Sequence, residues 1–544
     1  MCIALPKYSS HLIHTFMTTV SPISPISPLI RPTWTAPLPA IDRTVDSSNT
    51  TSAPAAGATP ATSVTLGRAD AATSAPIYAE PKPLNTAPVW ARESGDAISS
   101  LMAGNYLSRS LATRLQGLGA ALLDRFATES GDFSQSVMQP LPGAQQDGNA
   151  PTLDPDNLIT LDIKTASGAT VHLSLGSQDD SLAVQVQVTD GQLDDAERGA
   201  LEKLSGAFQT AIDGLTAKPP RLDLAGLTQF DPTVLSSVDL HASVKVDANN
   251  TQSLDFHADS QRRTVTATSA TGTVKVDVDM SNPTLLGGPA QQAQAIQRYL
   301  GQVDDAANRG KGDASLVAMF KDAFTEMNSN YGVAAPQRID AAHRIVLSDI
   351  DHHMLTGLAD FNASITQVAK AINPAQPTEF DNFTYQTSQS SSVLGLRQAD
   401  RTITQKQQSH LSAAYHQSLS PDVALDLNIT KQSQNYTYHQ IDDDASSTAE
   451  IGYQDGKMIK ASVDQSASRS THVSKYVMGR LVSDTTTPSE QSRSVDLMAL
   501  LSAAEHSLSS SSAREVSRGN QDLSTVDRAV LLQTEPTRLR SKVV

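Results

Sequence analysis

Apolar and polar residues alternate with a period of two over much of this chain, and this alternation is the strongest constraint on its fold. The pattern appears in three segments between residues 157 and 188 and in four more between 236 and 280, with turn signals between them. Successive side chains of a strand point to opposite faces, so a sheet with one buried and one wet face produces this pattern. The sequence therefore predicts antiparallel meander sheets.

A helical pattern separates these two groups of strands. Residues 193–215 read "LDDAERGALEKLSGAFQTAIDGL", with acidic residues near the start and an apolar stripe that includes Leu204, Phe208 and Ile212. Acidic residues favour a helix N-terminus, and an apolar stripe covers a sheet. Strands, a helix and more strands in this order predict an α+β fold with covering helices.

Residues 287–372 also show helical spacing. Apolar residues from Ile339 to Ile372 recur at threes and fours, which predicts one long helix or two helices separated near Gly357. Residues 378–484 alternate again, but Ser, Thr and Gln dominate and the apolar face is sparse. This segment predicts an elongated, solvated sheet or a sheet that pairs with a partner.

These patterns divide the chain into six regions. They are a disordered Ser/Thr/Pro/Ala-rich tail (1–92), an amphipathic helix with a linker (93–150), an α+β domain (151–285), a helical region (286–375), a polar antiparallel β region (376–485), and a short helix with a disordered tail (486–544).

The N-terminal region repeats proline at every third position in "SPISPISPLIRP", and no helical or strand period follows. Such composition predicts disorder, and both tryptophans, Trp34 and Trp90, lie in it. A tether accounts for this composition. The region also resembles the unfolded, uncleaved export signals of bacterial type III secretion substrates, which are polar and rich in Ser, Thr and Pro. No segment has the form of a cleaved signal peptide. We therefore expect a cytoplasmic protein or one exported without cleavage.

The composition limits the classes of partner. The chain carries 41 basic and 57 acidic residues, a formal net charge of -16, which repels nucleic-acid phosphates. No run approaches the roughly 20 apolar residues of a membrane-spanning helix. The single cysteine, Cys2, precludes an internal disulfide and a cysteine zinc site. A protein partner is compatible with the long polar strands, and the oligomeric state is left open.

The motifs of common enzyme classes are missing from the sequence. We find no phosphate-binding GxxxxGK[ST] loop, no HExxH zinc motif and no GxSxG nucleophile elbow. No catalytic residue and no cofactor is therefore predicted, and the chain favours a non-enzymatic function.

Two Asp-x-His pairs occupy neighbouring predicted strands. Asp239 and His241 share a polar face, as do Asp255 and His257. A hairpin centred on Asn250 would place His241 opposite Asp259, which predicts ordinary cross-strand partners rather than four metal ligands.

The segment "SDIDHHMLTG", residues 348–357, is dense in potential ligands. Its Asp351, His352 and His353 spell the motif of the DHH phosphoesterases, which are metal-dependent enzymes. The resemblance is limited to these three residues, because the GGGH-like segment of that family is absent. On a helix the three letters point in different directions, whereas Asp349 and His353 are neighbours at i and i+4. Asp349 and His353, with His343, are therefore the candidate metal ligands.

The sequence favours a non-enzymatic bacterial protein that is exported or binds a partner. The alternative is a metal-dependent hydrolase that uses Asp and His ligands around residues 343–353.

Overall fold

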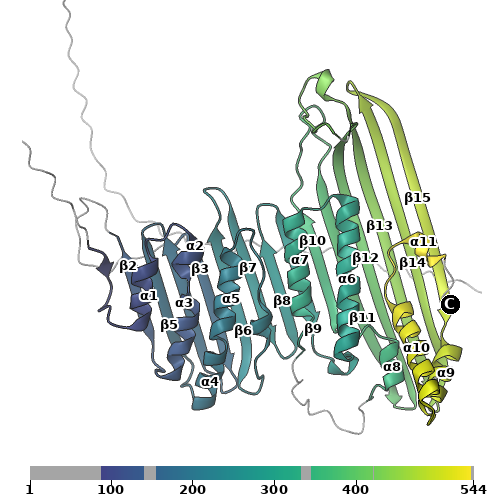
Figure 1. Cartoon of the computed structure of the whole chain (residues 1–544), viewed down its shortest axis with the longest axis horizontal. Coiled ribbons are helices and arrows are strands. Elements are labelled where there is room, and N and C mark those ends of the chain that lie inside the picture. The colour runs from purple at the N-terminus through teal and green to yellow at the C-terminus, as the bar shows by residue number, and fades with distance from the viewer. Residues whose placement is uncertain (1–86, 140–154, 332–344, 421, 541–544) are drawn as a thin grey trace, which may run out of the picture. The chain divides into compact units, whose positions relative to one another are not determined.

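A computed structural model describes residues 87–139, 155–331, 345–420 and 422–540. Its strands form one 15-stranded antiparallel sheet in the order β1-β2-β5-β4-β3-β6-β7-β8-β9-β10-β11-β12-β13-β14-β15. The α+β region and the polar β region, which differ so much in sequence, thus contribute to the same sheet (Figure 1). The predicted α+β class with meander sheets and covering helices is confirmed.

The first nine strands are short, and β3 to β9 have the predicted alternation. They are β1 (Val89–Trp90), β2 (Phe133–Met138), β3 (Asn157–Thr165), β4 (Thr170–Gln178), β5 (Ser181–Thr189), β6 (Leu235–Lys245), β7 (Thr251–Asp259), β8 (Arg262–Thr268) and β9 (Gly272–Asp279). Buried and exposed residues alternate along them, as expected for a sheet that is covered on one face.

The last six strands are mostly longer. They are β10 (Asp360–Gln367), β11 (Asn382–Arg397), β12 (Asp400–Ser418), β13 (Tyr436–Gln454), β14 (Lys457–Val477) and β15 (Arg480–Asp496). β14 has 21 residues and so spans about 70 Å. The far ends of these strands extend past the helices (Figure 1).

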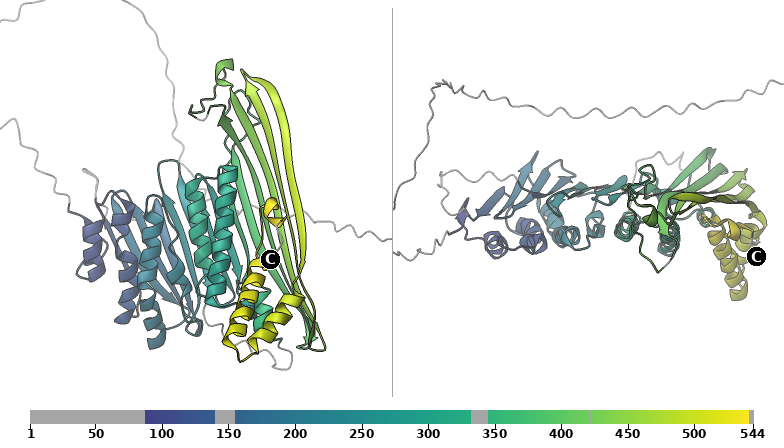
Figure 2. Two further views of the ribbon diagram at one scale, coloured as in Figure 1. Left: turned by 45° about the vertical axis from the view of Figure 1, so that its right-hand side comes forward. Right: turned by 90° about the horizontal axis from the view of Figure 1, so that it is seen from above.

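The helices lie on one side of the sheet (Figure 2, right). They are α1 (Ala97–Asn105), α2 (Leu111–Leu115), α3 (Leu118–Asp124), α4 (Asp195–Lys203), α5 (Ser205–Thr216), α6 (Pro289–Gly310), α7 (Ala314–Met327), α8 (Asp349–His353), α9 (Met498–Leu508), α10 (Ala513–Val530) and α11 (Pro536–Leu539). None of the helices in the described segments has the length and apolar character to cross a bilayer.

The main core lies between this helix layer and the sheet. Phe208 and Ile212 of α5 and Phe320 and Phe324 of α7 are fully buried against the apolar face of the strands. The predicted helix 193–215 is present as α4 and α5, and Asp194 and Glu197 form a capping box at its start.

Buried glutamines replace apolar residues where the long strands meet the C-terminal segment. Gln407 donates to the carbonyl of Val530 at 2.8 Å, and Gln465 donates to the carbonyls of Ala529 at 3.1 Å and Leu531 at 2.9 Å. These bonds satisfy backbone groups that would otherwise be buried unpaired. The scarcity of apolar residues in the polar β region therefore does not prevent burial of its helix-side face.

Several sequence predictions are wrong at the edges of the fold. Trp90 was placed in the tail, but it lies in β1 and pairs with Val137 of β2, a strand that the sequence did not suggest. The rest of the predicted disordered tail, residues 1–86, lies outside the described residues. The predicted helix of residues 93–126 is broken into α1, α2 and α3. Gly117, which takes a left-handed conformation (φ 73°) at the start of α3, accounts for the second break.

Two further predictions are wrong in the second half of the chain. Residues 286–375 are not helical throughout, because Asp360–Gln367 form β10. Phe361 and Ile365 fit both periods, and pairing with β9 and β11 selects the strand. The predicted disordered C-terminal tail instead contains α10, whose Leu523, Val526 and Val530 are buried. The predicted short helix before it is present as α9.

Candidate functional site

The face of the sheet opposite the helices, here called the open face, carries polar residues in rows that run across the strands. In an antiparallel sheet, directly opposed residues point to the same face, so the register determines which side chains are neighbours. One row consists of Asp277, Asn362, Ser388, Gln408, Ser446 and Ser466. The adjacent row consists of Lys275, Ser364, Gln386, His410, Asp444, Ser468 and Glu490.

These two rows line a hollow of about 720 Å³ that crosses β9 to β15. Seven strands at about 4.8 Å spacing make it roughly 29 Å long. Serine hydroxyls and side-chain amides supply both hydrogen-bond donors and acceptors, and no Phe, Tyr or Trp is among the described residues that line it. The hollow can therefore hydrogen-bond an extended polar ligand that lies across the strands.

The hollow is acidic. One lysine, Lys275, stands against Asp277, Asp444 and Glu490. Asp277 is already paired with Arg262 on the neighbouring strand, Nε to Oδ1 at 2.9 Å, so the remaining negative charge lies toward β13 and β15. This charge favours a cationic ligand and disfavours an anionic one.

Histidines on the open face pair with carboxylates. His241 Nδ1 lies 2.9 Å from Asp255 Oδ1, and His410 Nδ1 lies 2.9 Å from Asp444 Oδ1. The same arrangement holds for His172 with Asp162, His257 with Asp239, and His472 with Asp484. Exposed pairs of this kind contribute little to stability, so their repetition gives this face a distinct chemical character rather than rigidity.

One cluster on the open face has the donor set of a divalent metal site. Within the described segments, ligand atoms of His410, Asp442 and Asp444 all lie within 4.8 Å of one another. Imidazole and carboxylate ligands suit zinc and manganese. All three residues are at least partly exposed, and His410 already bonds Asp444, so this cluster also forms without an ion.

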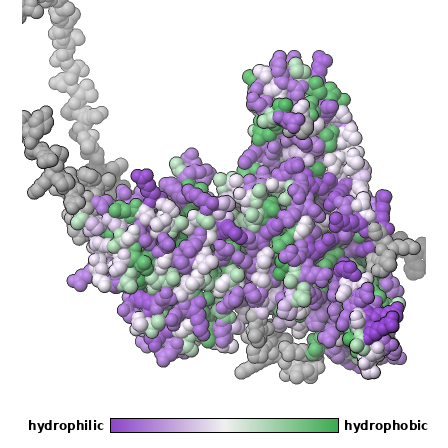
Figure 3. Space-filling model, in the orientation of Figure 1, coloured by the Kyte–Doolittle hydropathy of each residue, from purple (hydrophilic) through white to green (hydrophobic). Residues whose placement is uncertain are grey.

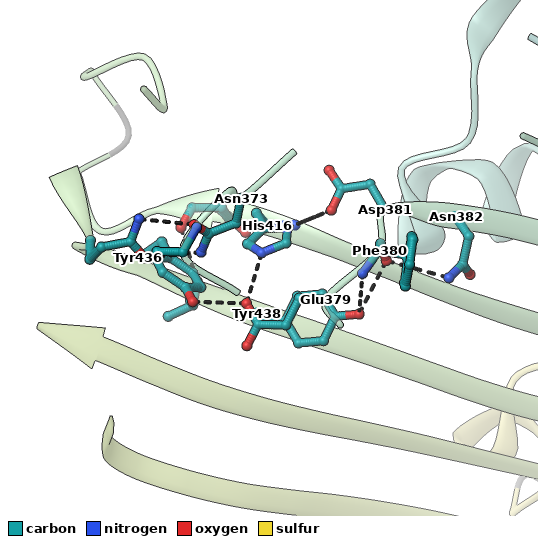
Figure 4. Close-up of polar contacts among 12 residues, drawn as sticks. Asn373, Glu379, Phe380, Asp381, Asn382, His416, Tyr436 and Tyr438 are labelled. Carbon is teal, nitrogen blue, oxygen red and sulfur yellow. Dashed lines mark hydrogen bonds and ion pairs between the residues drawn. The ribbon is translucent and has the colours of Figure 1, made fainter. Parts of the chain in front are cut away.

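A buried polar cluster lies on the open face near the far ends of the long strands (Figure 4). The His416 side chain of β12 is fully buried, with Nδ1 2.6 Å from Asp381 Oδ1 and Nε2 2.9 Å from Glu379 Oε2. Tyr436 of β13 donates its hydroxyl to the same oxygen of Glu379 at 2.8 Å. Asp381 and Glu379 belong to the connection from β10 to β11, so the cluster fastens this connection to the sheet.

Both ring nitrogens of His416 face carboxylates, and only the protonated imidazolium donates from both. Burial disfavours this charge, but the hydrogen bonds and attraction of Asp381 and Glu379 outweigh it and raise the pKa of His416 above its ordinary value. Burial and the neighbouring Glu379 likewise raise the pKa of Tyr436 and take that of Tyr476 to about 12. The tyrosines therefore remain neutral donors around the ion pair.

The three residues of the DHH motif make separate structural contacts. Asp351 is fully buried, caps α8 together with Ser348, and accepts from Arg401 Nη2 of β12 at 2.8 Å. The backbone carbonyl of His352 accepts from Gln291 Nε2 of α6 at 2.7 Å, and burial lowers the pKa of the His352 imidazole. His353 Nδ1 lies 2.7 Å from Asp527 Oδ1 of α10. These contacts fix α8 between the sheet and α10.

The candidate metal ligands have different environments. Asp349 is exposed at the first turn of α8, and His353 is paired with Asp527. His343 lies outside the described residues. In the described part of the chain, neither Asp349 nor His353 belongs to a group of three ligand residues close enough to share an ion.

The predicted register of the β6–β7 hairpin is wrong. His241 lies opposite Asp255 and Asp239 opposite His257, whereas the sequence placed His241 opposite Asp259. The turn is two residues nearer the N-terminus than Asn250, because Val246 and Asp247 both donate backbone hydrogen bonds to the carbonyl of Asn250. The four residues therefore form two separate His–Asp pairs on the open face.

Sequence reasoning missed the hollow and the His416 cluster. The alternation in residues 382–418 indicates that Gln386, Gln408 and His410 share one polar face, but it does not reveal which residues of different strands are neighbours. His416 stands in a polar segment, "AAYHQS", that gives no signal of burial. It is buried by Glu379 and Asp381 of the β10–β11 connection and by the rings of Tyr436 and Tyr438 of β13 (Figure 4).

Comparison with known proteins adds no functional information. No protein-family model matches this chain, and no similar curated protein or solved structure was found.

Proposed function

We propose that this chain is a non-enzymatic interaction protein that holds a protein partner in the hollow of its open face. The observation that carries this proposal is the pair of polar rows that line the hollow across seven strands. A solvated sheet face needs no such hollow, and its hydroxyls, amides and unequal charge match an extended polar segment with basic side chains.

The chemistry of the hollow favours binding over catalysis. Its histidine, His410, is 40% exposed and bonds a carboxylate that is 64% exposed, so both groups face water rather than an enclosed site that holds a substrate. Export without a cleaved signal is part of the same proposal. It is supported by the Ser/Thr/Pro-rich composition of residues 1–86.

Filling the hollow tests the binding function. Ser446 and Ser466 are cross-strand neighbours whose Oγ atoms lie 2.8 Å apart in the floor of the hollow. The double variant Ser446→Trp/Ser466→Trp should lose partners that the wild-type chain captures from the lysate of its own cells, as measured by quantitative mass spectrometry.

A matched control lies on the same face outside the hollow. Ser174 and Gln185 are also cross-strand neighbours, on β4 and β5. Ser174→Trp/Gln185→Trp should capture the same proteins as the wild type. Equal capture by the hollow-filled variant and this control would refute the proposal. A reporter fused to residues 1–86 and retained inside a secretion-competent strain would remove the export part alone.

A further inference from the structure

Exposed apolar side chains gather at the far ends of the long strands. Three connections meet there: residues 368–381 between β10 and β11, 419–435 between β12 and β13, and the β14–β15 turn at 478–479. We call these connections, with Leu481 and Val482 beside the turn, the tip. Its exposed large apolar residues are Val368, Ile372, Phe380, Leu419, Val423, Ile429, Met478, Leu481 and Val482.

The tip is richer in exposed large apolar side chains than the rest of the described surface. Single exposed apolar residues are normal, whereas grouped ones mark protein or membrane contacts. The tip holds nine of the 17 large apolar residues that are exposed in the described segments. Ile429 is 81% exposed and Val423 is 60% exposed. Figure 3 shows apolar patches on the lobe that projects beyond the helices.

The tip is a built structure rather than a set of loose loops. Asn373 and Gln434 exchange two side-chain hydrogen bonds of 2.9 Å, which join the first two connections. Met478 donates its backbone N–H to Asn435 Oδ1 at 2.9 Å, which joins the third. The buried His416 cluster lies beneath (Figure 4). A small apolar cluster of Ala414, Tyr436 and Tyr438, with Leu425 and Leu427 packed against it, supports these connections. The nine exposed apolar side chains lie outside this cluster and are held outward.

The charges of the tip nearly balance. When the flanking strand residues 475–484 are counted with the tip, the basic residues are Lys370, Lys431, Lys475 and Arg480, and the acidic residues are Glu379, Asp381, Asp422, Asp426 and Asp484. Glu379 and Asp381 are neutralised in part by His416. The chain as a whole has a formal charge of -16, so an anionic surface would repel it, whereas a zwitterionic one would not.

We propose that the tip inserts its apolar side chains into the interfacial region of a zwitterionic lipid bilayer. A projecting lobe can reach a flat surface without contact from the helices, which end short of it (Figure 1). Burial of several large apolar side chains at the boundary between headgroups and acyl chains supplies the affinity. This attachment is independent of partner binding in the hollow.

Vesicle flotation with the full chain tests this inference. The wild type should float with vesicles of phosphatidylcholine alone, and added phosphatidylserine should not strengthen binding. The variant Val423→Asp/Ile429→Asp should bind at least about tenfold more weakly, because two apolar groups that enter the bilayer are replaced by charged ones.

The opposite ends of the long strands supply a matched control. Leu396 is 89% exposed and Ile459 is 56% exposed at that end. Leu396→Asp/Ile459→Asp carries the same charge change and should float like the wild type. A melting curve for each variant confirms that it is folded.

A second readout does not depend on the charge variants. An Ile429→Trp variant should shift its emission to shorter wavelengths when phosphatidylcholine vesicles are added, and a Leu396→Trp variant should not. Absence of flotation by the wild type, or equal loss in both charge variants, would overturn the proposal. So would a wild-type dimer that Val423→Asp/Ile429→Asp converts to a monomer without any vesicle binding, because the tip would then join two copies of the chain.

Discussion

Replacement of His416 by alanine should loosen the β10–β11 connection, which His416 holds through Glu379 and Asp381. The substitution leaves the carboxylates of Glu379 and Asp381, which are 11% and 24% exposed, without the cation that bonds both. Removal of one partner of a buried ion pair costs about 3 to 5 kcal/mol. The partial exposure of Asp381 places the expected loss near the lower limit, about 3 kcal/mol.

Hydrogen exchange measured by mass spectrometry provides a local assay, because it reports the opening of a segment rather than unfolding of the whole chain. A loss of about 3 kcal/mol corresponds to roughly 100-fold faster exchange in peptides that cover residues 373–381. The ratio of variant to wild-type rates at one pH removes the intrinsic pH dependence of exchange.

The pH dependence of this rate ratio tests whether the imidazolium charge of His416 supplies the stabilisation. The folded-state pKa of His416 is raised, so the stabilisation is fully present below the ordinary histidine pKa, about 6.5, and is lost as the pH rises through the folded-state pKa. The ratio should therefore be largest near pH 6 and fall toward one at alkaline pH. The exposed pair of His410 and Asp444 is the control, and His410→Ala should change exchange by less than about threefold. A ratio near one at pH 6, or one that grows with pH, would refute the role of the imidazolium.

Three further substitutions test other parts of the fold. Asp351→Ala should lower the free energy of unfolding by about 3 to 5 kcal/mol in urea titrations, because it leaves Arg401 buried without its carboxylate; a loss below about 1 kcal/mol would contradict this. Burial raises the pKa of Glu326 to about 8. For this group alone, the folded protein is therefore most stable below the ordinary glutamate pKa, where the side chain is neutral, and it loses that stability as the pH rises to and through about 8. Glu326→Gln keeps an acceptor for the Leu224 N–H and should stabilise the protein by about 1 to 2 kcal/mol near pH 8 but not near pH 4, as measured by urea titration. Gln465→Ala leaves two buried carbonyls unpaired and should speed proteolytic release of the C-terminal segment, with unchanged kinetics contradicting the anchoring role.

The sequence predicted the fold class because strand alternation is a local signal. Residues 157–188 and 236–280 have the expected strands, and α5 buries Phe208 and Ile212 of its apolar stripe in the core. The same reasoning failed for Asp360–Gln367, where two periods fit and the neighbouring strands decide. It also failed for the C-terminal tail, whose order depends on Gln407 and Gln465, 64 to 123 residues earlier in the chain.

For the candidate metal site, too, local sequence showed part of the arrangement and the tertiary structure showed the rest. Placing "DHH" on a helix correctly separated its three residues, but the partners of Asp351 and His353 lie on β12 and α10 and have no trace in the local sequence. That Asp349, His343 and His353 share a metal ion stays a prediction.

The sequence by itself determined the alternation of the strands, the covering helices and the acidic, polar character of the surface, because each depends on residues close in the chain. Only the tertiary structure decided that all strands of the described segments belong to one sheet, that its open face has a polar hollow, and that His416 is buried beneath an apolar tip. These features arise from register and from long connections, which bring together residues that no local period relates.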